Sequence, residues 1–108
     1  MKTFADILAT LESADHLTSI ELRNADDRLA AIIENKPGSQ GSLRLYHHLW
    51  KKYGAINAAA AREGLALYAE HTADARAYPG KHPNIDRLFD VIESGGQLEV
   101  RCQPSRLP

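Results

Sequence analysis

Cysteine, basic surplus and long apolar runs are all scarce in this chain, and each absence excludes a class of protein. Cys102 is the only cysteine among 108 residues, so no internal disulfide can form and nothing points to an oxidising compartment. No apolar run approaches the length of a membrane span, and the first residues lack the unbroken apolar stretch of a signal peptide. We therefore expect no membrane partner and a cytoplasmic location.

Positive charge is balanced by negative charge. The chain has 13 Lys and Arg against 14 Asp and Glu, and aromatic residues make up 6% of it. A protein that binds nucleic acid needs a basic surplus to displace counterions from phosphates, and often aromatic side chains on which bases stack. We therefore do not expect nucleic acid as a partner.

The overall shares of apolar and charged residues are those of an ordinary globular protein. Apolar residues make up 44% of the chain and charged residues 25%. A chain of this length can bury a hydrophobic core without a disulfide or a structural metal. We expect residues 1–103 to form a single domain and residues 104–108, which contain two prolines, to be a frayed tail.

The spacing of apolar residues predicts an α+β fold of order α-β-β-α-α-α-β. Helical spacing predicts four helices, at 3–13, 43–53 (with Ser42 as its N-cap), 57–77 and 85–94. Alternation or unbroken apolar runs predict three strands, at 17–23, 28–34 and 97–102. The first two strands form a hairpin, and we expect the second, apolar from Leu29 to Ile33, to be central in a three-stranded sheet with helices packed mainly on one face.

A Gly/Ser-rich loop at residues 35–42 is the first candidate site. A strand, a glycine-rich loop and a helix start together favour a small anionic ligand, phosphate- or carboxylate-bearing, because backbone N–H groups and the positive end of the helix dipole then face it. A protein partner and a plain connection are the alternatives. The predicted ligand-binding residues include two from the 79–83 turn, if that turn lies beside the loop: Asn35, Lys36, Gly38, Ser39, Gly41, Ser42, Lys81 and His82.

A group of histidines and carboxylates is the second candidate, and it indicates a small hydrolase or lyase. His71 or His82 would be the catalytic general base, with Asp86 among the carboxylates that orient it. If the 79–83 turn folds back, four side chains could also hold a divalent metal: Glu70, His71, Asp74 and His82. A solvated helix end is the alternative, because no tight metal signature is present. The sequence identifies no cofactor and does not decide whether the protein is an enzyme.

A structural homodimer is the third hypothesis. A sheet of only three strands leaves edges that must be covered or protected. Pairing of two sheets would cover them, and charged residues on the outer face would then fix the register: Arg23, Glu99 and Arg101.

Two stretches carry a resemblance. They are Ile33–Arg44, and Leu67–Thr72 taken together with Pro79–Leu88. Both resemble a family of small bacterial proteins known only as a domain of unknown function. The resemblance implies a bacterial cytosolic protein, and it supplies no activity, substrate or catalytic residue.

Overall fold

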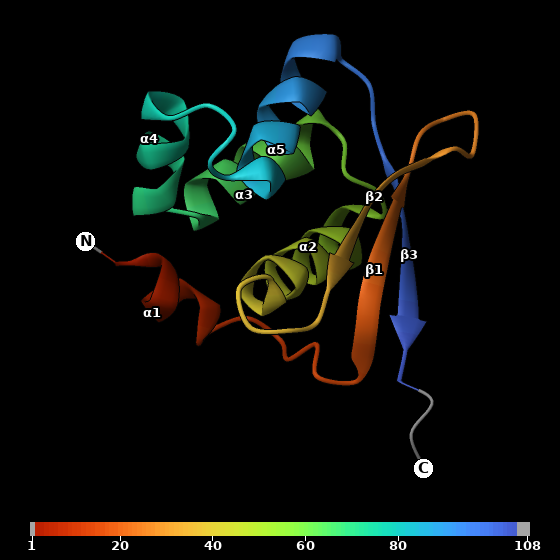
Figure 1. Cartoon of the computed structure of the whole chain (residues 1–108), viewed down its shortest axis with the longest axis horizontal. Helices are drawn as coiled ribbons and strands as arrows, with labels where there is room; N and C mark the ends of the chain where they lie inside the picture. Colours follow the sequence, from red (N-terminus) through yellow and green to blue (C-terminus); the bar gives the residue numbers. More distant parts are fainter. Residues whose placement is uncertain (1, 106–108) are drawn as a thin grey trace.

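The computed structural model describes residues 2–105, which form one α+β domain with the predicted order of elements (Figure 1). The helices are α1 (Phe4–Leu8), α2 (Gln40–Tyr53), α3 (Ala58–Leu67), α4 (Glu70–Ala77) and α5 (Pro83–Ser94). The strands are β1 (Leu17–Arg23), β2 (Leu29–Glu34) and β3 (Glu99–Pro104). Within residues 2–105, no helix is both long enough and apolar enough to cross a membrane.

The strands form an antiparallel sheet of order β2-β1-β3, so β1 is the central strand. The expectation that residues 28–34 would be central is therefore wrong. In the register, Ile20 of β1 lies between Ile33 of β2 and Cys102 of β3. An unbroken apolar run describes the two faces of a strand and not its edges, so it could not show that β2 lies at the edge of the sheet.

All five helices lie on the same side of the sheet, as the sequence predicts (Figure 1). Helix α2 packs between the sheet and the pair α3 and α5, and its Leu43, Tyr46 and Leu49 are buried. The sheet contributes Ile20 and Leu22 to the same core. The alternating residues of β1 place charged side chains on the opposite face, as expected for an antiparallel sheet covered on one side.

The helix predicted over residues 57–77 is broken in two, which is a second correction. Ala69, between α3 and α4, has φ 52° and ψ −117°, a conformation outside the helical region. The inner side of this segment nevertheless stays in the core, because Tyr68, Thr72 and Ala75 are all buried. The hydroxyl of Thr72 donates to the carbonyl of Leu65 at 2.5 Å and closes the break. The sequence has no glycine or proline at this point to mark it.

Three element ends also differ from the prediction. Helix α1 has the expected capping box between Thr3 and Asp6, but it ends at Leu8 and not at residue 13. Helix α2 begins at Gln40, so Ser42 lies in its first turn and not at the N-cap. Strand β3 continues to Pro104, and the N–H of Ser105 donates to the carbonyl of His16 at 2.8 Å. The rest of the predicted tail, residues 106–108, lies outside the described part of the chain.

Candidate functional site

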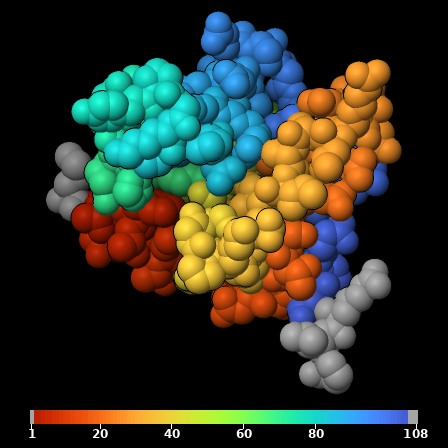
Figure 2. All heavy atoms as spheres, in the orientation of Figure 1, coloured from red at the N-terminus to blue at the C-terminus, as the bar shows by residue number. Residues whose placement is uncertain are grey.

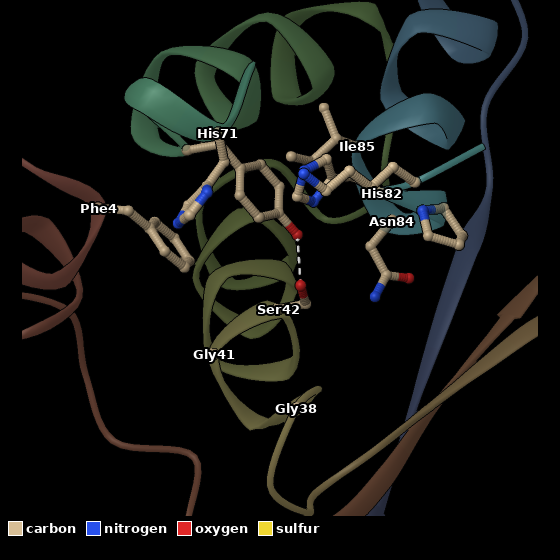
Figure 3. A pocket seen from close by; sticks show the side chains of 11 residues that line it. Phe4, Gly38, Gly41, Ser42, His71, His82, Asn84 and Ile85 are labelled. Atoms are coloured by element: carbon tan, nitrogen blue, oxygen red, sulfur yellow. Dashed lines mark hydrogen bonds between the residues drawn. The ribbon is translucent and has the colours of Figure 1, made fainter. Parts of the chain in front are cut away.

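A pocket of about 390 Å³ opens where α1, the start of α2 and the α4–α5 turn meet. These segments, red, yellow and cyan, meet on one face of the molecule in Figure 2. Figure 3 shows the lining side chains arranged around the opening, with Phe4 and His71 on one side and His82 and Asn84 on the other. The lining residues are Phe4, Gly38, Gly41, Ser42, Tyr68, His71, Lys81, His82, Pro83, Asn84 and Ile85.

Helix α2 presents its N-terminus to this pocket. Gly41 and Ser42 lie in its first turn, where backbone N–H groups have no carbonyl partner within the helix. Gly41 lets α1 approach closely, because a Cβ atom there would lie 3.2 Å from Cδ1 of Leu8. Gly38, with φ 96°, lets the preceding loop adopt a left-handed conformation that other residues disfavour. The pocket therefore has a wall of backbone that carries partial positive charge.

Helix α5 presents a second N-terminus to the same pocket. It begins at Pro83, and Asn84 and Ile85 of its first turn also line the opening. The two helices have 14 and 12 residues, long enough for each to carry a full dipole. Pro83 has no N–H, and the N–H groups of Ile85 and Asp86 donate to the His82 carbonyl, which leaves the N–H of Asn84 as the first-turn donor available at α5. First-turn residues of both helices therefore line one pocket.

The ionisable lining residues other than tyrosine are Lys81, His71 and His82, and none of the carboxylates in residues 2–105 lines the pocket. Just outside the lining, Asp74 accepts a hydrogen bond from His82 Nε2 at 2.6 Å and contacts Lys81 Nζ at 3.0 Å. The hydrogen bonds from His82 and Lys81 lower the pKa of the Asp74 carboxyl. Asp74 thus holds both basic side chains in place and offsets part of their charge.

Aromatic rings form the apolar side of the pocket. Phe4 stacks on Tyr68 with ring centroids 5.0 Å apart, and the ring of His71 meets Phe4 edge-on at 5.3 Å. The Tyr68 hydroxyl donates to Ser42 Oγ at 2.7 Å, the bond drawn in Figure 3. Burial raises the pKa of Tyr68, so its hydroxyl stays protonated and keeps this bond. A ligand here would meet both positive potential and an aromatic surface.

The structure brings five of the predicted ligand-binding residues together around the pocket: Gly38, Gly41, Ser42, Lys81 and His82. The other three serve the loop itself. The Asn35 side chain donates to the carbonyl of Leu17 at 2.7 Å, and the Ser39 hydroxyl donates to that of Glu34 at 2.6 Å. Lys36 lies outside the pocket lining, with its Nζ 3.5 Å from Glu34 Oε1.

The predicted histidine and carboxylate group comes together only in part. The His71 and His82 rings are 5.8 Å apart, and His82 contacts Asp74. Glu70 instead accepts the Phe4 N–H at 2.8 Å, and Asp86 accepts the Gly80 N–H at 2.9 Å. Across the described residues, no three His, Cys, Asp or Glu side chains are grouped so that they could hold a metal ion.

Sequence reasoning missed the aromatic side of the pocket and the start of α5. Phe4 and Tyr68 follow helical spacing, which predicts a core position and does not show that these residues line a pocket. The Pro83-Asn84 pair does mark a helix start, because proline favours the first helical position. That signal locates the second N-terminus along the chain, but not its position opposite the first.

Comparison with known proteins identifies the family of this chain. Residues 4–102 match the family described as "Uncharacterized protein conserved in bacteria (DUF2322)". The match spans nearly the whole chain, so the chain belongs to this bacterial family, in agreement with the resemblance in the sequence. No curated protein and no solved structure matches the chain.

Proposed function

We propose that this DUF2322 protein binds a small ligand with a phosphate or carboxylate group in the pocket between α2 and α5. The observation that carries the proposal is that the first turns of two helices line one pocket whose ionisable lining residues, apart from Tyr68, are Lys81, His71 and His82. Helix N-termini bind anions through unpaired N–H groups and the helix dipole. Two of them facing one space favour an anion more than either does alone.

The pocket also limits what the rest of the ligand can be. Its volume of about 390 Å³ lies within the range of small-molecule sites. The half-buried ring of Phe4, which stacks on the buried ring of Tyr68, gives the pocket an apolar side beside the basic groups. We therefore expect an anionic group joined to a flat or apolar portion rather than a highly charged ligand.

A thermal-shift screen of the full chain tests the proposal, with inorganic phosphate, phosphorylated metabolites and carboxylates as probes. A ligand at a hundred times its Kd stabilises the folded state by about 2.7 kcal/mol, a shift of several degrees for a domain of this size. Lys81→Gln should weaken binding about tenfold, because it removes a positive charge from the pocket.

Lys36→Gln is the matched control. Lys36 carries the same charge as Lys81, but it lies in the loop before α2 and outside the pocket lining. Its replacement should therefore keep the binding affinity within about twofold of that of the unchanged chain. Equal losses in both variants would show that net charge and not the pocket is responsible. A chain that no anion in the panel stabilises would contradict the proposal and turn attention to a protein partner.

A second function, acid–base catalysis in a hydrolase or lyase, is favoured by one contact. His82 Nε2 lies 2.6 Å from Asp74 Oδ2, and a carboxylate that orients an imidazole is a recurring arrangement for a general base. If a bound anion is also turned over, Asp74→Asn should lower kcat more than binding. If anions of the panel bind and none is turned over, the catalytic function is contradicted and the binding function stands.

A further inference from the structure

A second cleft, of about 570 Å³, lies between α5 and the β1–β2 hairpin, and we call it the α5 cleft. Figure 2 shows α5, in cyan to blue, next to the hairpin, in orange to amber. Asp86, Arg87 and Asp90 of α5 line the cleft, and of its lining residues only Pro83 also lines the anion pocket between α2 and α5. The α5 cleft is therefore a separate space, and its volume lies within the range of small-molecule sites.

Arg87 is half-buried and is held from the side of the core. Its Nη1 donates to Asn84 Oδ1 at 2.7 Å and to the Tyr46 hydroxyl at 3.2 Å. Its guanidinium lies over the ring of Tyr46, 5.7 Å from the ring centroid, and Tyr46 is fully buried. The guanidinium is thus fixed in position by the protein itself, which lowers the entropy that a ligand loses on binding to it.

The Nε and Nη2 atoms of Arg87 have no partner among residues 2–105. Two other arginines in this part of the chain are half-buried, and both use the same two atoms. Arg23 donates from them to Glu21, and Arg44 donates from them to two backbone carbonyls. This edge of a guanidinium binds a carboxylate through two parallel hydrogen bonds. Arg87, which lines the cleft, therefore has an unused group for a carboxylate.

Carboxylates lie beside this guanidinium without pairing with it. Asp90 is three residues after Arg87 and shares its helix face, yet it is exposed and has no hydrogen bond or ion pair within residues 2–105. Asp86 accepts the Gly80 N–H at 2.9 Å and forms no ion pair in that part of the chain. The cleft is thus lined by one positive and two negative side chains that do not neutralise one another directly.

We propose that the α5 cleft binds an α-amino acid with an apolar side chain, at a site separate from the anion pocket. The free edge of Arg87 binds the carboxylate of this ligand, and Asp90 binds its ammonium group. A simple anion would meet two carboxylates and a simple cation would meet the guanidinium, so a ligand with both charges is the most complementary. Exposed Ala30 and Pro83 give the cleft an apolar side for the side chain of the ligand.

A thermal-shift panel of leucine, methionine, valine and phenylalanine selects the probe, and calorimetric titration of the full chain then measures its affinity. Two derivatives of the probe should bind at least about tenfold more weakly: the N-acetyl form, which lacks the ammonium group, and the amide, which lacks the carboxylate. Asp90→Asn should weaken binding of the probe about tenfold. Arg87→Lys should do the same, because it keeps the charge and loses the two parallel donors.

Glu93→Gln is the matched control, since it removes an exposed carboxylate from the same helix outside the cleft and should keep the affinity within about twofold. Lys81→Gln, which alters the anion pocket, should also keep it within about twofold. Circular dichroism identifies a variant that fails to fold. If Arg87→Lys is such a variant, Asp90→Asn and the two derivatives decide the matter.

Three results would each overturn the proposal. The first is a chain that none of the four amino acids stabilises, and the second is an N-acetyl form that binds as tightly as its parent. The third is a probe whose binding is lost in Lys81→Gln and kept in Asp90→Asn, because its carboxylate then lies in the anion pocket. That third result would leave the proposed function standing, so the two proposals can fail separately.

Discussion

Single carboxylates tie the helices of this domain together. Glu63 of α3 accepts hydrogen bonds from three residues of α2: His48 Nε2 at 2.7 Å, Lys52 Nζ at 2.6 Å and Tyr53 Oη at 2.8 Å. Burial alone would raise the pKa of Glu63, but these donors outweigh it and lower the pKa to about 2. The carboxylate therefore stays charged and bonded at any ordinary pH.

His47 is the opposite case, a buried group without a hydrogen bond. Its side chain is 3% exposed, its Nδ1 has no hydrogen-bond partner among residues 2–105, and Glu12 Oε2 lies 3.8 Å away. Burial lowers the pKa of His47, the Glu12 carboxylate opposes that shift, and His16, Lys51 and His48 add to it. The folded protein thus holds this imidazole neutral.

We expect His47 to make the protein less stable in mild acid. As the pH falls through about 6.5, the unfolded chain binds a proton at this residue before the folded chain does, so the free energy of unfolding decreases until the pH passes the lowered pKa of the folded chain. One such proton changes that free energy by at most about 1.4 kcal/mol per pH unit.

Urea unfolding of the wild type and of His47→Leu, at pH 7.5 and at pH 5.5, measures this contribution. The wild type should lose more stability than the variant between the two values, because the imidazole at position 47 is the only titrating group that the variant lacks. Parallel losses in the two proteins would show that His47 titrates alike in the folded and unfolded chains.

At the scale of elements, the break between α3 and α4 gives the pocket one of its walls. It turns α4 away from α3, so that Tyr68, His71 and the α4–α5 turn all face the N-terminus of α2. The turn requires φ 52° at Ala69, where a Cβ atom is strained and glycine is not.

We predict that Ala69→Gly stabilises the domain by about 1 kcal/mol, since it relieves this strain. The matched control is Ala73→Gly, which makes the same replacement at an exposed position inside α4 and should destabilise by about 0.5–1 kcal/mol. Thermal unfolding of both variants gives the comparison. A loss of stability in both would mean that position 69 responds as an ordinary helical residue.

For the whole molecule, the pocket is built from segments that lie far apart in the sequence. Lys81 lies in the α4–α5 turn, and Gly41 lies at the start of α2. The loop before α2 is held at its base by the hydrogen bonds of Asn35 and Ser39. The pocket therefore exists only once these segments have packed together.

The sequence predicted the class and the order of elements correctly. Five of the residues proposed for ligand binding line one pocket, and their role stays a prediction. Period-two and helical spacing located the strands and most helices, because side-chain direction in each element follows from backbone geometry. The same periodicity could not distinguish the edge strand β2 from a central strand, and it continued a helix through Ala69. In the loop, glycines and Ser42 were identified by their chemistry, whereas Lys36, chosen for its charge, lies outside the pocket.

Local chemistry determined where the chain turns, which faces are apolar and which loop is rich in glycine and serine. Only the tertiary structure decided that α5 begins opposite α2, that Asp74 holds Lys81 and His82, and that β2 has a free edge. The physical reason is distance along the chain. Spacing and propensity act over a few residues, whereas these contacts join segments that meet only once the core has packed.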